Sequence, residues 1–210
     1  MAISDILRFA PNRRSRGFTL MESLIALAVA SILVTAAVPA LQDFIIRNRM
    51  STEVNTFTAS LYLARSEAVK RVQNVKICPT TDYQQCTGGT IWGGTDSQDA
   101  HIGWMVFQDV NDNAVVDIDT DTLLQQNPPL PPRFQIIGDA GRPDAVFQAT
   151  GQAGGSNNTF VFCDTGNVAS TRKVYLSSEG RVRVDKLAST DCSVAANGDG
   201  GTGGGGGHGH

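Results

Sequence analysis

The chain opens with a basic segment and then changes abruptly to an apolar one. Residues 1–17 contain four arginines and one acid, whereas residues 24–41 form a run of 18 residues without a charged side chain. A helix rises about 1.5 Å per residue, so residues 18–41 would span roughly 36 Å and exceed the hydrocarbon core of about 30 Å. The pattern predicts a membrane-spanning helix. The basic segment before it places the N-terminus in the cytoplasm and the rest of the chain outside.

A helical periodicity continues beyond the apolar run. Over residues 42–77, which contain neither Gly nor Pro before Ile77, hydrophobic residues recur at steps of three and four. This spacing lines one face of a helix. We therefore expect an amphipathic helix whose stripe packs on the protein's own sheet. The stripe consists of Ile46, Met50, Val54, Phe57, Leu61, Ala64, Ala68 and Val72.

From Val75 onward, apolar and polar residues alternate in short runs between turn residues, as is typical of strands. One long helix before an antiparallel β region gives an α+β fold. The β-rich domain would cover residues 78–194, and the Gly-rich residues 195–210 would form a flexible tail. The predicted strands are residues 75–78, 101–108, 123–126, 134–138, 145–149, 159–163, 173–178 and 181–187.

Composition excludes several classes of protein. Apolar residues make up 41% of the 210 residues, so the chain is not disordered as a whole. The formal net charge of −3 excludes a uniformly basic protein that coats nucleic acid, although it permits a local basic patch. The sequence contains no nucleophile elbow, P-loop or metalloprotease helix. We therefore expect neither catalysis nor a cofactor.

The four cysteines indicate an exported domain, because an even number outside the cytoplasm favours disulfides. Three pairings are possible. We favour Cys78 with Cys86 and Cys163 with Cys192, since these bonds close two loops that do not overlap. A zinc site is not expected, because no CxxC is present and His101 is the only nearby histidine.

The N-terminal motif is more specific than an ordinary membrane anchor or a secretory signal peptide, for which residues 38–42 offer a poor cleavage site. A basic leader ends in Gly17, Phe18 follows, and Glu22 interrupts the apolar segment. A carboxylate inside a spanning helix is costly and needs a partner. This segment resembles the N-termini of type IV prepilins and type II secretion pseudopilins. The resemblance implies that a prepilin peptidase cuts between Gly17 and Phe18 and methylates the new N-terminus. It also implies that Glu22 pairs with the N-terminal amine of a neighbouring pilin.

Later segments resemble the FimT/GspH group of pilin-like proteins. They are residues 76–79, 103–107, 109–113, 116–117 and the final hairpin, residues 174–183. The resemblance implies a long N-terminal helix packed on an antiparallel, β-sandwich-like domain. It further implies a minor component that assembles with major and minor pilins. Such a protein would start as a single-pass protein of the inner membrane, with its globular domain in the periplasm, and would then reach a pilus at the cell surface.

FimT-type minor pilins of this group bind DNA during natural transformation through a Gly-Arg-x-Arg motif, which matches Gly180, Arg181 and Arg183 here. Alternate residues of a strand share a face about 7 Å apart, so the two arginines would project together. Residues 172–186 carry five basic and two acidic side chains, and the remaining basic ones are Arg172, Lys173 and Lys186. No helix is predicted within residues 172–186 that could enter a major groove. We expect contact with the phosphates of double-stranded DNA and little sequence specificity.

Two functions remain open at this stage. The first is a FimT-like minor pilin that takes up extracellular DNA. The second is a structural minor pilin or a GspH-like pseudopilin of type II secretion, which primes or joins a filament without binding DNA. In the second case Arg181 and Arg183 are ordinary solvated residues of a strand whose Val182 and Val184 face the core.

One acidic loop resembles the start of a calcium-binding loop, because oxygen-bearing side chains alternate from Asp109 to Asn113 and return at Asp117. Position six is Ala114 instead of Gly, and position twelve is Thr120 instead of Glu. We therefore interpret residues 109–117 as a polar turn in which Asp and Asn side chains bond the backbone.

Overall fold

The computed structural model describes residues 17, 19–93, 103–139, 141–166, 171–186 and 192. Phe18, most of the leader and the Gly-rich tail lie outside these ranges. The chain divides into two compact units, residues 1–44 and residues 45–210. Each unit is described by itself below.

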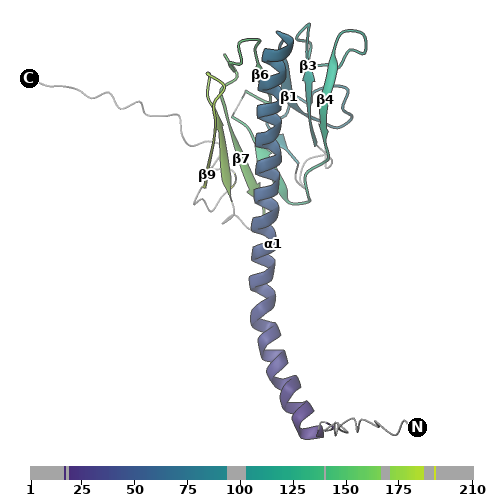
Figure 1. Cartoon of the computed structure of the whole chain (residues 1–210), viewed down its shortest axis with the longest axis vertical. Helices are drawn as coiled ribbons and strands as arrows, with labels where there is room; N and C mark the ends of the chain where they lie inside the picture. The colour runs from purple at the N-terminus through teal and green to yellow at the C-terminus, as the bar shows by residue number, and fades with distance from the viewer. Residues whose placement is uncertain are drawn as a thin grey trace, which may run out of the picture. The chain divides into compact units, whose positions relative to one another are not determined.

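The helix α1 covers Leu20–Arg71 and therefore contributes to both units (Figure 1). In the first unit its apolar side chains are exposed, among them Leu24, Ile32 and Leu41. The sequence predicted a spanning helix over residues 18–41. Within the part of the chain that the structure describes, no helical stretch combines the length and hydropathy that crossing a membrane requires.

In the second unit the predicted stripe is confirmed over most of its length. Six of its members, Met50, Val54, Phe57, Leu61, Ala64 and Ala68, are at most 3% exposed. The prediction fails at Val72, which is 69% exposed and adopts a φ of 56°. This left-handed conformation is unfavourable for a β-branched residue within a helix. The helix consequently ends at Arg71 instead of continuing to residue 77, and an extended strand follows after a short turn.

Nine strands form two antiparallel sheets in the second unit, counted over the described residues. All eight predicted strands are present, with ends shifted by a few residues. The added strand, β2 (Ile91–Trp92), is too short to show an alternating pattern. The first sheet has the order β4-β3-β1-β6, with β1 Val75–Thr80, β3 Gly103–Gln108, β4 Thr122–Asn127 and β6 Ala145–Phe147. The second has the order β2-β5-β7-β8-β9, with β5 Phe134–Ile137, β7 Asn158–Asp164, β8 Arg172–Leu176 and β9 Val182–Lys186.

Phe57 of α1 joins the helix to both sheets. Its ring centroid lies 5.7 Å from that of Trp104 on β3 and 4.8 Å from that of Phe160 on β7, both in edge-on geometry. Such aromatic pairs add roughly 0.5–1.5 kcal/mol beyond the burial of their area. The indole nitrogen of Trp104 donates a 3.1 Å hydrogen bond to the hydroxyl of Ser60. The α+β architecture is therefore confirmed, with one core that the helix and both sheets share.

Both disulfides follow the pairing favoured from the sequence. Cys78 on β1 is bonded to Cys86, and Cys163 on β7 is bonded to Cys192. The first bond closes a loop beside β1, and Cys78 packs with Met105 and Phe107 in a small second cluster. The second bond ties a residue beyond the last strand to the interior of the five-stranded sheet.

Candidate nucleic-acid interface

The predicted Gly-Arg-x-Arg segment lies on the hairpin at one edge of the five-stranded sheet. We call β8, β9 and the turn between them, residues 172–186, the basic hairpin. In its antiparallel register Tyr175 lies opposite Arg183, and Val174 lies opposite Val184. Because side chains alternate between faces, Tyr175 and Arg183 share the outer face, whereas Val182 packs against the core from the other. Val184, expected in the core, is 43% exposed at the sheet edge.

The turn of the basic hairpin depends on Gly180. Its φ is 75°, which glycine adopts without steric cost. A Cβ at this position would also collide with the carbonyl oxygen of Gly151 in a neighbouring loop. Arg65 of α1 donates to the carbonyl oxygens of Gly180 at 3.0 Å and Glu179 at 3.3 Å. The helix and this loop therefore fix the turn immediately before Arg181.

Arg181 and Arg183 project into solvent from this fixed turn, with side chains 79% and 69% exposed. The guanidinium carbon of Arg183 lies 4.7 Å from the centroid of the Tyr175 ring. Both arginines line a hollow of about 420 Å³, together with Tyr175, Ser177 and Val182. We call it the β9 hollow. The structure thus brings together the two arginines that the sequence singled out.

The other three predicted basic residues differ from this pair. Lys173 is only 5% exposed, so it is not available to a phosphate, contrary to the expectation from the sequence. Arg172 is half-buried and donates a 3.1 Å hydrogen bond to the carbonyl of Thr171. Lys186 is exposed and lies opposite Arg172 in the hairpin register. Within the described part of the chain, the lining of the β9 hollow includes none of the three.

Each exposed arginine also has a carboxylate beside it. Arg181 lies 3.7 Å from Glu179, and Arg183 lies 2.9 Å from Asp185. A hydrogen bond from the Ser177 hydroxyl, the largest cause, lowers the pKa of Glu179, and further bonds from its own backbone and from Ser178 act in the same direction. Glu179 is therefore ionised at neutral pH. Exposed ion pairs contribute only about 0–1 kcal/mol, so an incoming anion can replace these carboxylates.

At the N-terminus, Gly17 is exposed and Thr19 immediately precedes α1. The backbone N–H of Glu22 donates to the Thr19 hydroxyl at 3.2 Å, which is the contact of an N-cap. Glu22 occupies the first turn, where a carboxylate suits the positive end of the helix dipole, and its side chain is exposed. It is accessible to a charged group from outside the subunit.

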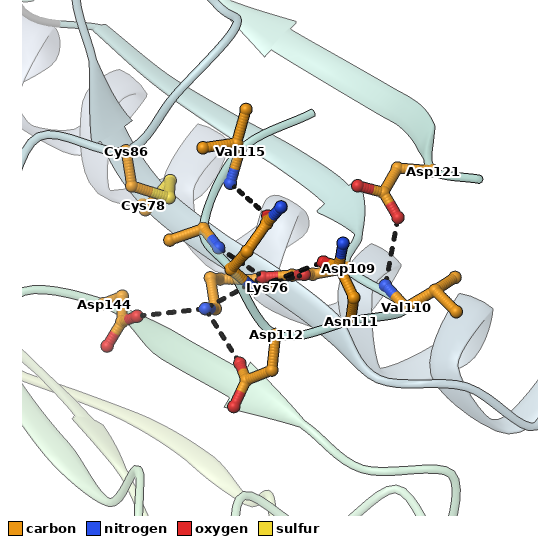
Figure 2. A network of polar contacts seen from close by, with 12 residues as sticks. Lys76, Cys78, Cys86, Asp109, Val110, Asn111, Asp112, Val115, Asp121 and Asp144 are labelled. Carbon is orange, nitrogen blue, oxygen red and sulfur yellow. Dashed lines mark hydrogen bonds and ion pairs between the residues drawn. A yellow bond between two sulfur atoms is a disulfide. The ribbon is translucent and has the colours of Figure 1, made fainter. Parts of the chain in front are cut away.

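The acidic loop after β3 is organised around a lysine (Figure 2). The Lys76 ammonium lies 2.9 Å from Asp109, 3.0 Å from Asp112 and 3.9 Å from Asp144. Asp109, which is 1% exposed, also accepts the backbone N–H groups of Asn113 and Ala114. Among the described residues, no group of three or more His, Cys, Asp or Glu side chains could hold a metal ion. Asp and Asn side chains of the loop bond its backbone, as we inferred for a polar turn, and Lys76 of β1 supplies a cation.

The charge of this lysine is preserved in the fold. Burial acts most strongly and lowers the pKa of Lys76, but the hydrogen bonds to Asp109 and Asp112 together outweigh it, so the pKa is raised above its ordinary value. Burial raises the pKa of Asp144, which lies further from the ammonium. The ammonium of Lys76 therefore compensates the buried charge of Asp109.

Sequence reasoning missed Tyr175 and Arg65. Tyr175 and Arg183 each lie four positions along the chain from residue 179, at the centre of the turn. A symmetric hairpin register would therefore have predicted that they lie opposite one another. Arg65 had no such signal, because 115 positions separate it from Gly180 in the chain.

The chain is similar to two proteins of known structure. The chain is similar to the crystal structure of the type IV minor pilin FimU of Pseudomonas aeruginosa, with 18% identity, a TM-score of 0.49, and coverage of 68% of this chain and 92% of that one. It is also similar to the minor pseudopilin EpsH of the type 2 secretion system of Vibrio cholerae, with 14% identity, a TM-score of 0.45, and coverage of 67% and 99%. No curated protein sequence matches the chain.

Two family models match the sequence itself. The model described as prokaryotic N-terminal methylation motif matches residues 12–38, which implies processing by a prepilin peptidase and assembly with other pilins. Prepilins of this type are typically anchored in the inner membrane before they enter a filament. The model described as type II transport protein GspH matches residues 53–180, more than half of the 210 residues. The chain therefore belongs to the GspH family of pilin-like proteins, which are structural proteins and not enzymes.

Proposed function

We propose that this protein is a minor pilin that binds extracellular DNA through the basic hairpin during natural transformation. The observation that carries the proposal is the placement of Arg181 and Arg183, which are both exposed and line the same hollow at a sheet edge. Guanidinium groups bind phosphate oxygens in bidentate geometry. The contacts would be made to the backbone of double-stranded DNA and would give little sequence specificity.

The distribution of charge supports this choice of surface. The basic hairpin has a net charge of +3, from five basic and two acidic residues, whereas residues 78–151 have a net charge of −8, from two basic and ten acidic residues. A positive patch on an acidic domain directs a polyanion to one face. Because Lys173 is buried, the phosphates would meet Arg181, Arg183 and the exposed Lys186.

Processing and assembly at the N-terminus would precede DNA binding. Cleavage between Gly17 and Phe18 would remove residues 1–17, and Phe18 would become the methylated first residue. Glu22 would pair with the N-terminal amine of a neighbouring pilin. The exposed carboxylate in the first turn of α1 supports this role. The protein would begin as a single-pass protein with its globular domain in the periplasm and would then reach the pilus surface.

A second candidate function is a structural minor pilin or type II secretion pseudopilin that binds only protein. The ion pairs of Arg181 with Glu179 and of Arg183 with Asp185 favour it, because both arginines already have an acidic partner.

DNA titration separates the two functions. The full chain, with its disulfides oxidised and in a non-ionic detergent, is titrated into labelled double-stranded DNA at low and near-physiological salt. We compare the wild type with Arg181→Ala/Arg183→Ala, and with Arg47→Ala/Arg49→Ala as a control that removes two exposed arginines from α1. We expect affinity that falls with salt, and a salt slope that decreases by about one for each arginine that no longer meets a phosphate. Loss of binding in the hairpin variant alone would support DNA uptake. Binding by neither the wild type nor any variant would favour the structural function.

A further inference from the structure

We propose that the β9 hollow holds one unstacked nucleotide of single-stranded DNA, with its base against the Tyr175 ring and its phosphate between Arg181 and Arg183. This inference rests on the proposed function. It adds a base to what would otherwise be a site for phosphates alone, and it makes Tyr175 a binding residue.

The register of the hairpin places the guanidinium of Arg183 beside the Tyr175 ring, in the position that a stacked base would occupy. Tyr175 and Arg183 are directly opposite one another on β8 and β9, so their side chains emerge about 5 Å apart on the same face. The guanidinium of Arg183 is 4.7 Å from the ring centroid and 69% exposed. The ring of Tyr175 is therefore accessible from solvent to a planar group, here the guanidinium of Arg183. A base is also flat, and bases stack on both aromatic rings and guanidinium planes.

The size of the hollow fits one nucleotide. Its volume of about 420 Å³ lies in the lower part of the range of roughly 300–1,000 Å³ that is typical of sites for small ligands. The lining is divided between two kinds of chemistry. The ring of Tyr175 offers apolar surface to the face of a base, and Arg181 and Arg183 offer charge to a phosphate.

The arginines are able to change partners. Glu179 lies 3.7 Å from Arg181 at a side-chain exposure of 58%, and Asp185 lies 2.9 Å from Arg183 at 43%. Ion pairs in such solvated positions are weak, so a phosphate displaces the carboxylates and a base displaces the guanidinium from the ring. The backbone below them does not need to move, because Arg65 bonds the carbonyl oxygen of Gly180 and the Ala153 N–H bonds that of Ser178.

Stacking on Tyr175 requires a base whose face is exposed, and this requirement favours single-stranded DNA over duplex DNA. In a duplex the faces of the bases are stacked on their neighbours, so only phosphates and groove edges are available to a protein. A single strand or a frayed end exposes the face of a base. Single-stranded DNA should consequently gain affinity from Tyr175, whereas duplex DNA should not.

The test uses the full chain in a non-ionic detergent and three labelled DNAs with the same number of phosphates per strand. They are a thymidine oligonucleotide, a strand of abasic sites, and a duplex. We expect the wild type to bind the thymidine strand about tenfold more tightly than the abasic strand, as one stacked base contributes. Tyr175→Leu should abolish that difference and Tyr175→Phe should keep it. Tyr62→Leu, at a 51% exposed position on α1, is the matched control and should also keep it.

The outcomes separate this inference from the function on which it rests. Equal binding of the thymidine and abasic strands by the wild type, with loss in Arg181→Ala/Arg183→Ala, would overturn the base site and leave phosphate binding intact. A tenfold difference that persists in Tyr175→Leu would overturn the assignment to Tyr175. Absence of binding to all three DNAs would overturn both proposals.

Discussion

Arg65 of α1 donates a 3.0 Å hydrogen bond to the carbonyl oxygen of Gly180, the residue immediately before the first exposed arginine. The bond joins the C-terminal part of α1 to the turn of an edge hairpin. Because the same guanidinium also reaches the carbonyl of Glu179, one side chain restrains two successive peptide units. The position of Arg181 is therefore set from the helix and not by β9 alone.

Replacement of Arg65 should weaken the turn without unfolding the domain. We expect Arg65→Leu to lose about 1–2 kcal/mol of unfolding free energy, since two hydrogen bonds from a charged donor disappear. If the basic hairpin binds DNA, affinity should also fall, although less than in Arg181→Ala. Urea titration and DNA titration of the same samples give both values. Stability loss equal to that of Arg49→Leu, an exposed replacement on the same helix, would show that the turn contacts contribute nothing of their own.

Gly180→Ala should be more damaging than an ordinary glycine replacement. Any L-residue at a φ of 75° incurs about 1–2 kcal/mol of strain, and the new Cβ would in addition meet the carbonyl of Gly151. Gly141→Ala provides a matched control, because Gly141 has a φ of 77° and no atom within 4 Å of the added carbon. Chemical denaturation should rank Gly180→Ala clearly below Gly141→Ala. Equal midpoints would contradict the steric argument.

The buried lysine should tolerate neutralisation poorly. In Lys76→Met the carboxylate of Asp109 remains at 1% exposure without its cation, and breaking a buried pair in this way costs about 3–5 kcal/mol. Lys76→Met/Asp109→Asn removes both charges and should recover part of the loss, which calorimetry of the four proteins in a double-mutant cycle measures. Lys70→Met, at a 73% exposed position, should be nearly neutral. An equally small effect of Lys76→Met would refute the proposed role of the internal cation.

Acid sensitivity should depend on Asp82 in the loop that the Cys78–Cys86 disulfide closes. The backbone N–H of Gln84, the largest cause, lowers the pKa of Asp82 below its ordinary value of 3.8, and the N–H of Gln85 and the Thr80 hydroxyl add to this effect. Because the folded-state pKa is the lower one, the contribution to stability is present above pH 3.8 and is lost as the pH falls through the folded-state value.

In Asp82→Asn we therefore expect a loss of about 1 kcal/mol at neutral pH that shrinks below pH 4. Denaturation midpoints of wild type and variant between neutral pH and about pH 3 measure the trend. Asp119→Asn, an exposed replacement in another loop, should show no such convergence. A difference for Asp82→Asn that stays constant with pH would contradict the expected loss of this contribution in acid.

Removal of a competing carboxylate should strengthen DNA binding if the basic hairpin is the site. Asp185 lies 2.9 Å from Arg183, and Asp185→Asn leaves the guanidinium free for a phosphate. The gain should be at most about fivefold, because exposed pairs contribute only about 0–1 kcal/mol. Asp119→Asn changes net charge equally at a distant loop, and DNA titration of both should separate local from general charge. Equal gains would point to net charge alone.

Local patterns predicted much of this fold. The stripe from Met50 to Ala68 and the eight strands could be predicted because the spacing of apolar residues follows the period of the backbone, three to four residues in a helix and two in a strand. The end of α1 was not visible, since Val72 continues the stripe yet adopts a left-handed conformation.

At the candidate site, Gly180, Arg181 and Arg183 were proposed from their resemblance to the Gly-Arg-x-Arg motif. The burial of Lys173 was not predicted. Burial depends on what covers the outer face of β8, and the sequence of the hairpin does not contain that information. The same holds for Lys76, whose three carboxylate partners come from residues 33 or more positions away, such as Asp109.

The bond between Cys163 and Cys192 also determines how the basic hairpin responds to tension. Both β8 and β9 lie between these two cysteines, so a pull on the turn loads a covalently closed ring. Edge strands held by hydrogen bonds alone can be peeled away one pair at a time. Here the detachment of β8 from β7 cannot lengthen the chain beyond the circumference of that ring. Once the hydrogen bonds between β7 and β8 are broken, a load on the turn is therefore carried by covalent bonds to Cys163 within β7.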